Sequence, residues 1–363
     1  MTKINIVLAD SDELYLNKLT GYFMEKTNMF DICSFTSKES LIKYISNTQN
    51  KVDMIAFTED LADDTISMAD IPAKVFLSDG SFSNVNRFES VNKYQKAEKL
   101  VNSIRMIYAE KTGRVDAVTT GDKQTKAIGV YSPVGGCGKT TMALALSMHL
   151  ANIGKRVFYL NYEIVNSTTE FLNTAPSGSL SDVFLSVKTK GANVGLRIVA
   201  NKYKDSVTKI DFINPPESAL ELNELTIQEQ LKLMNEIDTL GEFNAVVVDF
   251  DSGFGLPKLD LLDSCDVILM PFTTDAMSLS KIRLLMNEFR MHRELDSLFR
   301  KIYLAVNKAD GHTNSILQSS GILDEKSVEV SMPISPTLAD IKNLSYMVDS
   351  MQNVFVNFTN KVF

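Results

Sequence analysis

The hydrophobic pattern in the first third of the chain alternates between short apolar runs and longer stretches with apolar residues at helical spacing. The short runs have the length of buried strands, and the longer stretches have the period of amphipathic helices. Since strands and helices alternate, the sequence predicts a small α/β domain with a parallel sheet over residues 1–110. The expected strands are residues 3–8, 30–35, 52–57 and 73–77, and the expected helices are residues 14–23, 37–46 and 97–109.

A second and larger α/β domain is predicted over residues 126–363. Its apolar runs are unbroken, which is typical of strands that lie in a parallel sheet with helices covering both faces. Residues 111–125 are interpreted as a linker, because this stretch is polar, contains glycine and lacks an apolar period. The expected strands are residues 127–131, 156–160, 194–200, 243–249, 267–270 and 302–306. The expected helices are residues 142–151 and 179–187, one opened by a Thr226–Glu229 capping box, and one from Met277 to Phe289.

The stretch from Leu344 to Phe358 also has apolar residues at helical spacing. A helix that lies on a membrane surface normally carries Lys or Arg on its polar face. Here the polar face holds Asp349, Gln352 and Asn357 instead. We therefore expect this helix to pack onto the second domain.

The composition indicates a globular protein and argues against non-specific nucleic-acid binding. The chain has 363 residues, of which 44% are hydrophobic and 23% are charged, which is typical of a globular protein and argues against long disorder. The formal net charge is −8. Non-specific binding to nucleic acid needs clustered Lys and Arg, and no such cluster is present, so nucleic acid is not an expected partner.

Cysteine usage and targeting signals indicate the cytoplasm. The 3 cysteines are widely spaced, which excludes a disulfide framework and the usual zinc-ligand spacings. A reducing compartment is the natural interpretation. The N-terminus leads directly into an apolar strand, so we expect no signal peptide. No run approaches the roughly 18 apolar residues that a membrane span requires.

The candidate chemistry is concentrated in the glycine-rich stretch Ser132–Thr141, which reads SPVGGCGKTT. An expected strand leads into it and an expected helix leads out, which is the context of a phosphate-binding loop. The standard pattern starts with glycine where this chain has Pro133, and a chance glycine turn is the alternative. Lys139 would reach the β- and γ-phosphates of ATP, and Thr140 would hold Mg²⁺. The predicted nucleotide-binding residues of the loop are Gly135, Gly136, Cys137, Gly138, Lys139, Thr140 and Thr141.

Further polar residues follow other expected strands. Asp249 ends an apolar strand and would hold Mg²⁺ together with Thr140. Asp251 follows in a segment that either responds to the γ-phosphate or forms a plain turn. Glu163 and Asn307 also come directly after strands. Because ligands of parallel sheets bind at the carboxyl ends of the strands, these side chains are expected at one site. The predicted catalytic residues are Lys139, Glu163, Asp249 and Asp251.

Residues 126–363 resemble the ParA/MinD family of positioning ATPases. The resemblance implies a homodimer that encloses ATP and Mg²⁺. It also implies that Glu163 orients water, that Asn307 reads the adenine and that Pro333 lies near the base. The family's variant loop carries a lysine that reaches the partner's nucleotide, and this chain has Val134 there. Loss of one cation weakens transition-state stabilisation. We therefore hypothesise ATP binding and dimerisation with slow hydrolysis.

The first domain resembles the receiver domains of response regulators. The resemblance implies an acidic metal-binding pair at Asp10 and Asp12, a hydroxyl at Ser78 and a lysine at Lys93. The position of the phosphorylated Asp is Thr58 here, and a register shifted by one or two residues would place Glu59 or Asp60 there instead. We interpret the domain as a degenerate receiver that docks partners without being phosphorylated. Capping of the following helix is an equally good explanation of Asp10 and Asp12.

The combination of these two domains resembles the TadZ/CpaE group, which positions the secretion machinery of tight-adherence (Flp-type) pili. The implied partners are a second copy of the chain and the pilus machinery or polar landmark proteins, with any membrane association being indirect. Two alternatives stay open: a positioning ATPase for flagella, chemoreceptors or plasmids, and a signalling ATPase that responds to phosphorylation. The sequence argues against a nitrogenase-type iron protein, because Cys265 has no suitably placed second cysteine. It also lacks the tyrosine-rich tail of bacterial tyrosine kinases and the helix-turn-helix of transcriptional regulators.

Overall fold

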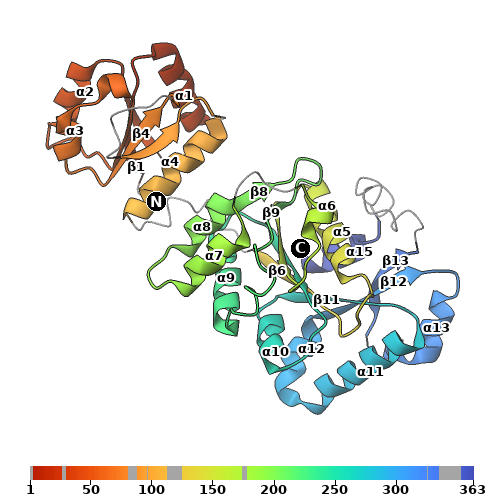
Figure 1. The fold of residues 1–363 in the computed structure, drawn as a ribbon. Coiled ribbons are helices and arrows are strands. Elements are labelled where there is room, and N and C mark those ends of the chain that lie inside the picture. The colour runs from red at the N-terminus through yellow and green to blue at the C-terminus, as the bar shows by residue number, and fades with distance from the viewer. Residues whose placement is uncertain are drawn as a thin grey trace. The chain divides into compact units, whose positions relative to one another are not determined.

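The computed structural model divides the chain into two compact units, residues 1–119 and residues 120–363 (Figure 1). It describes residues 3–26, 30–80, 88–95, 97–112, 125–173, 178–324, 326–334 and 353–363.

The first unit is built on a parallel five-stranded sheet with the order β2-β1-β3-β4-β5. Apolar side chains of β1 and β3, such as Val7, Ile55 and Phe57, form the core on one face together with Leu41 of α2. The strands are β1 (Ile4–Ala9), β2 (Phe30–Phe35), β3 (Met54–Phe57), β4 (Ala73–Ser78) and β5 (Glu89–Asn92). The helices are α1 (Glu13–Lys26), α2 (Lys38–Ile45), α3 (Asp64–Met68) and α4 (Ala97–Thr112).

The second unit contains an eight-stranded sheet with the order β13-β12-β11-β6-β10-β7-β9-β8, in which only β8 runs antiparallel to its neighbour. The strands are β6 (Lys126–Val130), β7 (Val157–Tyr162), β8 (Lys202–Lys204), β9 (Asp211–Ile213), β10 (Ala245–Phe250), β11 (Val267–Phe272), β12 (Ile302–Ala309) and β13 (Val328–Pro333). The α/β fold class with parallel sheets is thereby confirmed.

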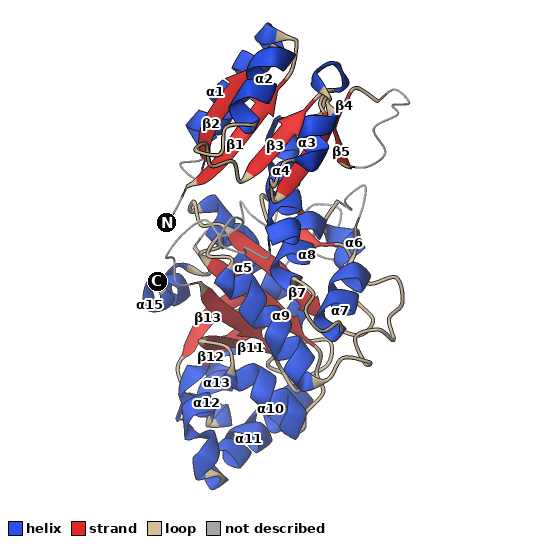
Figure 2. Cartoon of the chain, turned by 90° about the vertical axis from the view of Figure 1, so that its left-hand side faces the viewer, coloured by secondary structure: helices blue, strands red, loops and turns tan. Residues whose placement is uncertain are grey.

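Helices cover both faces of this sheet, as Figure 2 shows. Val246 and Val248 of β10 belong to one apolar cluster, whereas Ala245 and Val247 belong to the cluster on the opposite face. This explains why the strand is apolar at every position. The helices are α5 (Lys139–Asn152), α6 (Thr168–Phe171), α7 (Leu180–Lys188), α8 (Val194–Asn201), α9 (Ile227–Thr239), α10 (Leu256–Asp263), α11 (Ala276–Met291), α12 (Asp296–Lys301), α13 (Thr313–Ser320) and α15 (Val356–Val362).

One expected strand is wrong, since residues 194–200 form helix α8. The β-branched residues in this stretch favour a strand locally. A local signal opposes that preference, because the Asn193 side chain accepts a hydrogen bond from the Leu196 amide and so caps a helix. Val194 and Ile198 then bury their side chains on one face of that helix.

Of the C-terminal helix expected from Leu344 to Phe358, residues 344–352 lie outside the described part of the chain. The described end forms α15, and Phe355 and Phe358 are fully buried against the sheet. Lys361 forms an ion pair of 2.6 Å with Glu329 on β13. The packing expected for this segment therefore holds for its described residues. Across the described ranges, no helix is long and apolar enough to cross a bilayer.

Asp211 on β9 makes the stability of the second unit depend on pH. Burial raises the pKa of Asp211 to about 6, although Lys202 and Lys204 oppose the shift. An aspartate with a raised folded pKa stabilises the fold when protonated, and that stability is lost as pH rises from about 4 to 6. We expect Asp211→Asn to be up to about 3 kcal/mol more stable than wild type at pH 8, because a pKa raised by one corresponds to about 1.4 kcal/mol. Thermal unfolding at pH 8 measures the difference, and the same comparison at pH 4 is the control, where the two proteins should match. Equal stability at both pH values would contradict the prediction.

Candidate functional site

The glycine-rich loop joins β6 to α5 and has two glycines in the left-handed region. Gly136 has φ = 70° and Gly138 has φ = 90°. Gly138 precedes the first turn of α5, and its carbonyl accepts the Met142 amide at 2.9 Å. A Cβ atom at Gly138 would lie 2.2 Å from Asn307 Nδ2. Glycine is therefore required at Gly138 by both backbone conformation and space.

Asn307 fixes the loop from a strand far along the sequence. It is buried at the end of β12, and its Nδ2 donates a 2.8 Å hydrogen bond to the Cys137 carbonyl. Its Oδ1 accepts the Lys308 amide at 2.8 Å. Asn307 thus holds the loop backbone in place, and the adenine-reading role stays a prediction.

Lys139 connects the loop to the segment after β10. Its Nζ donates a 2.6 Å hydrogen bond to Ser252 Oγ, which in turn donates to the Val134 carbonyl at 3.4 Å. Only 7% of Lys139 is exposed. A phosphate oxygen is a stronger acceptor for this ammonium group than a neutral hydroxyl.

The oxygen ligands predicted for Mg²⁺ are Thr140, at the start of α5, and Asp249, on β10. Thr140 Oγ1 donates to Glu163 Oε2 at 3.0 Å. Asp249 is fully buried, and burial together with the nearby Glu163 raises the pKa of Asp249 to about 7. Its Oδ2 accepts the Tyr159 hydroxyl at 3.0 Å, while its Oδ1 has no partner in the described structure. An orphaned carboxylate oxygen beside a hydroxyl and a second carboxylate suits Mg²⁺, which is usually held by one or two carboxylates plus phosphates.

Alternate residues of β7 support these ligands. Side chains two residues apart on a strand point to the same face. Asn161 Nδ2 donates to the Tyr159 hydroxyl and to Thr168 Oγ1, each at 3.2 Å. Asn161 Oδ1 accepts the Glu163 amide at 2.7 Å. Tyr159 and Asn161 are not among the residues predicted for the site, although their period-two spacing with Glu163 is a signal in the sequence.

Removing the hydroxyl that orients Asp249 should weaken Mg²⁺ binding. Loss of such a supporting partner typically weakens metal affinity by 10-fold or more. We expect Tyr159→Phe to raise the Mg²⁺ concentration needed for half-maximal ATP binding about tenfold. Titration of Mg²⁺ at fixed ATP measures this. Tyr203→Phe, on β8, is the control and should behave as wild type. Unchanged Mg²⁺ dependence in Tyr159→Phe would refute the role.

Asp251 makes the contacts of a turn. Its Oδ1 accepts the Gly253 amide at 2.6 Å, and its Oδ2 forms a 3.1 Å ion pair with Lys258 of α10. Of the two interpretations of this segment, the turn explains both contacts. A response of Asp251 to the γ-phosphate stays a prediction.

The other residues of the glycine-rich loop and Pro333 differ in solvent exposure. Val134 is 7% exposed and packs in an apolar cluster of the same chain. Cys137 is buried, and burial raises the pKa of its thiol. Thr141 is half-buried, and Gly135 is exposed. Pro333 is exposed at the end of β13, which pairs with the Asn307 strand.

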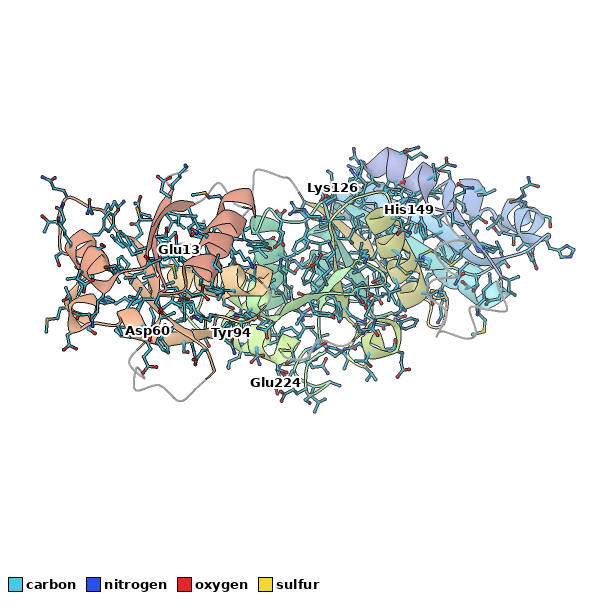
Figure 3. All side chains as sticks on the ribbon, turned by 90° about the horizontal axis from the view of Figure 1, so that it is seen from above. Glu13, Asp60, Tyr94, Lys126, His149 and Glu224 are labelled. Carbon is cyan, nitrogen blue, oxygen red and sulfur yellow. The ribbon has the colours of Figure 1, made fainter. Side chains whose placement is uncertain are left out.

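The first unit has a neutralised acidic centre. Asp10 is 1% exposed, and its Oδ2 forms a 2.9 Å ion pair with Lys93. Asp12 Oδ1 accepts the Tyr15 amide at 3.0 Å, which is a helix-capping contact. The Tyr15 ring packs edge-on against Tyr94, labelled in Figure 3.

The hydroxyl groups of Thr58 and Ser78, near Asp10, differ in their hydrogen bonding. Thr58 Oγ1 is buried without a described partner, and Ser78 Oγ accepts the Gly80 amide at 3.0 Å. In the residues that the structure describes, no cluster of three or more His, Cys, Asp or Glu side chains could hold a metal ion. The hydrogen bond from the Tyr15 amide fits the capping interpretation of Asp12.

Comparison with known proteins identifies the fold of the second unit. Residues 125–299 match a family model described as an AAA domain. The chain is 24% identical over 182 residues to the cell division protein PomZ of Myxococcus xanthus, covering 48% of this chain and 54% of PomZ. The chain thus spans about half the length of the curated relative that it matches.

Two solved structures share this fold at low sequence identity. One is a ParA family ATPase from Chlorobium tepidum, with 15% identity, a TM-score of 0.50, and coverage of 64% of this chain and 92% of that one. The other is the septum site-determining protein MinD in complex with Mg-ADP from Pyrococcus horikoshii, with 14% identity, a TM-score of 0.50, and coverage of 66% and 96%. The second unit has the fold of ParA- and MinD-type P-loop ATPases.

Proposed function

We propose that the chain is a Mg²⁺-dependent ATP-binding protein that pairs with a second copy and positions a cellular assembly. One observation carries this proposal. The loop lysine, the Thr140–Glu163 pair and the buried Asp249 meet at one edge of the sheet, where one Asp249 oxygen has no partner among the described residues. ATP with Mg²⁺ supplies the negative phosphates and the cation that such a set of groups requires.

The residues of the site have distinct roles in this proposal. Lys139 would exchange the Ser252 hydroxyl for phosphate oxygens, and the backbone amides of the glycine-rich loop would bind the same phosphates. Thr140 and Asp249 would hold Mg²⁺. Bound Mg²⁺ would neutralise phosphate charge and orient the β- and γ-phosphoryl groups.

Slow hydrolysis follows from the groups that the loop lacks. The Val134 side chain is apolar and packs inward, so this position offers no positive charge to a transferring phosphoryl group. Glu163, proposed to orient water, already accepts the Thr140 hydroxyl. Asp251 is engaged by Lys258. We therefore infer a turnover below about 1 per second.

The assembly proposed as cargo is the secretion machinery of tight-adherence pili. Support comes from the combination of a receiver-like unit with a ParA/MinD-type unit. In the first unit Lys93 already neutralises Asp10, and a threonine stands at the acceptor position, which supports docking over phosphorylation. Positioning of a different assembly is the second candidate, because the chain resembles PomZ, a cell division protein.

Two measurements test these proposals. Light scattering of the purified chain should give a monomer mass without nucleotide and a dimer mass with ATP and Mg²⁺. A constant mass in both conditions would overturn the ATP-dependent pairing. Deleting the coding sequence in the source cells should remove tight-adherence pili from the surface and leave division intact. A division defect with normal pili would favour the second candidate.

A further inference from the structure

A cleft of about 410 Å³ is lined on one side by Val134, Gly135 and Gly136 of the glycine-rich loop. The segment after β11, including Asp275, lines another side. Lys281 of α11 and Lys308 of β12 complete the lining. A Cβ atom at either glycine would meet no other atom within 4 Å, so the loop backbone is open on this side.

The two lysines of the cleft have no partner among the described residues. Both side chains are exposed, and neither ammonium group makes a hydrogen bond or an ion pair with a described residue. The other lysines of the site are engaged, Lys139 by Ser252 and Lys258 by Asp251. Unpaired ammonium groups that line one cleft attract an anion, because each lacks a compensating charge.

The carboxylate of Asp275, which lines the cleft, already accepts hydrogen bonds from two neighbouring residues. Asp275 Oδ1 accepts the Ser278 amide at 3.0 Å at the start of α11, and Asp275 Oδ2 accepts the Thr273 hydroxyl. These contacts and the helix N-terminus lower the pKa of Asp275, with the Thr273 hydrogen bond as the largest cause. Asp275 therefore holds the helix start, and the two ammonium groups leave the cleft with a net positive charge.

The backbone at Lys308 is strained. Lys308 has φ = 55°, and only Lys209 shares a positive φ among the described non-glycine residues. The β12–β13 register shifts between Val306 and Ala309, so Lys308 lies in a bulge. Bulges redirect side chains, and strain of this kind concentrates at ligand sites. The Asn307 side chain, which also holds the loop at Cys137, fixes this conformation.

We propose that Lys281 and Lys308 form a binding site for the terminal phosphates of a nucleotide, on the outer side of the glycine-rich loop. The site presupposes the nucleotide binding proposed above. The phosphates belong either to the nucleotide in the same chain's loop or to the nucleotide of a second copy that faces the cleft. Phosphate oxygens satisfy both ammonium groups at once, beside the open backbone of Gly135 and Gly136.

The test uses the full chain with both lysines replaced. Lys281→Ala is combined with Lys308→Asn, because asparagine tolerates a positive φ. Affinities for ADP and ATP are measured with Mg²⁺ at protein concentrations that keep the chain monomeric, and the ATP-dependent dimer constant is measured separately. ADP affinity should stay within about twofold of wild type, because Lys139 and Thr140 are intact.

Two results support the site and identify the source of the phosphates. A loss of ATP affinity of about tenfold or more in the monomer indicates the chain's own nucleotide, since one lost charged contact is of that size. If ATP affinity of the monomer is unchanged and the ATP-dependent dimer is at least about tenfold weaker, the phosphates belong to the nucleotide of the second copy. The double replacement by arginine should retain most of either property, because it keeps both charges.

Other results overturn the site. If wild type binds ATP and the double variant matches it in monomer affinity and in dimer constant, the phosphate site is refuted while the proposed function stands. If wild type binds no nucleotide in Mg²⁺, the proposed function fails and the phosphate site fails with it. Lys188→Ala, on α7, is the control for loss of a surface lysine and should leave both constants unchanged.

Discussion

Lys139→Ala should weaken ATP binding by at least about 100-fold. The ammonium group is almost fully buried and is directed at the loop and at Ser252. Each hydrogen bond to a charged group contributes about 1.5–3 kcal/mol, and about 1.4 kcal/mol corresponds to a tenfold change in affinity. Loss of two phosphate contacts therefore gives the stated factor. Isothermal titration with ATP and Mg²⁺ measures it.

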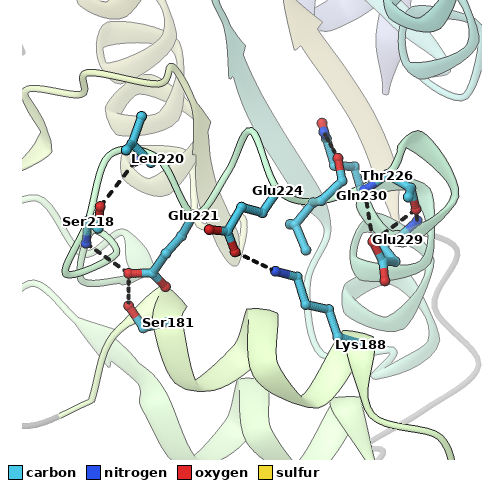
Figure 4. Close-up of polar contacts among 10 residues, drawn as sticks. Ser181, Lys188, Ser218, Leu220, Glu221, Glu224, Thr226, Glu229 and Gln230 are labelled. Carbon is cyan, nitrogen blue, oxygen red and sulfur yellow. Dashed lines mark hydrogen bonds and ion pairs between the residues drawn. The ribbon is translucent and has the colours of Figure 1, made fainter.

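The matched control for this variant is Lys188→Ala. Lys188 lies on α7 and pairs with Glu224 at 2.9 Å, as Figure 4 shows. An ion pair of this exposed kind contributes at most about 1 kcal/mol. The control should thus fold normally and bind ATP as wild type does. ATP affinity of Lys139→Ala within threefold of this control would exclude the loop as the phosphate site.

Gly138→Ala should destabilise the second unit by about 3 kcal/mol and prevent tight nucleotide binding. A left-handed backbone costs an alanine roughly 1–2 kcal/mol. The new Cβ would also lie 2.2 Å from Asn307 Nδ2, so the amide must leave the Cys137 carbonyl. A buried carbonyl that loses its partner costs about 1–3 kcal/mol. Urea unfolding monitored by circular dichroism gives the change in unfolding free energy.

Gly154→Ala is the control that separates the cost of a left-handed backbone from the cost of the steric clash with Asn307. Gly154 has φ = 82°, and a Cβ there would meet nothing within 4 Å. Its variant should therefore lose only the roughly 1–2 kcal/mol of backbone strain and keep nucleotide binding. Equal losses for the two variants would show that Asn307 plays no part in holding the loop.

Much of the fold could be predicted from local pattern. The central strands β6, β10 and β11 are buried on both faces, so each appears as an unbroken apolar run. Strand β5 was missed because it reads Glu-Ser-Val-Asn at a sheet edge and buries only Val91. Helix α8 was misread because its β-branched residues favour a strand until packing decides otherwise.

The sequence by itself determined the groups of the candidate site that belong to one short segment. The loop glycines, Lys139 and Thr140 follow one another, and Asp249 ends a recognisable strand. Each of these signals extends over a few residues, which is the range that periodicity and motif spacing can resolve.

Only the tertiary structure decided how those groups are held. Tyr159 orients Asp249 across 90 residues, Lys139 reaches Ser252 across 113, and Asn307 fixes Cys137 across 170. Such partners meet because parallel strands bring their carboxyl ends to one edge, in an order that the sequence does not reveal. The glycine-rich loop is thus specified locally, while its shape and the acidity of Asp249 depend on burial within the assembled sheet.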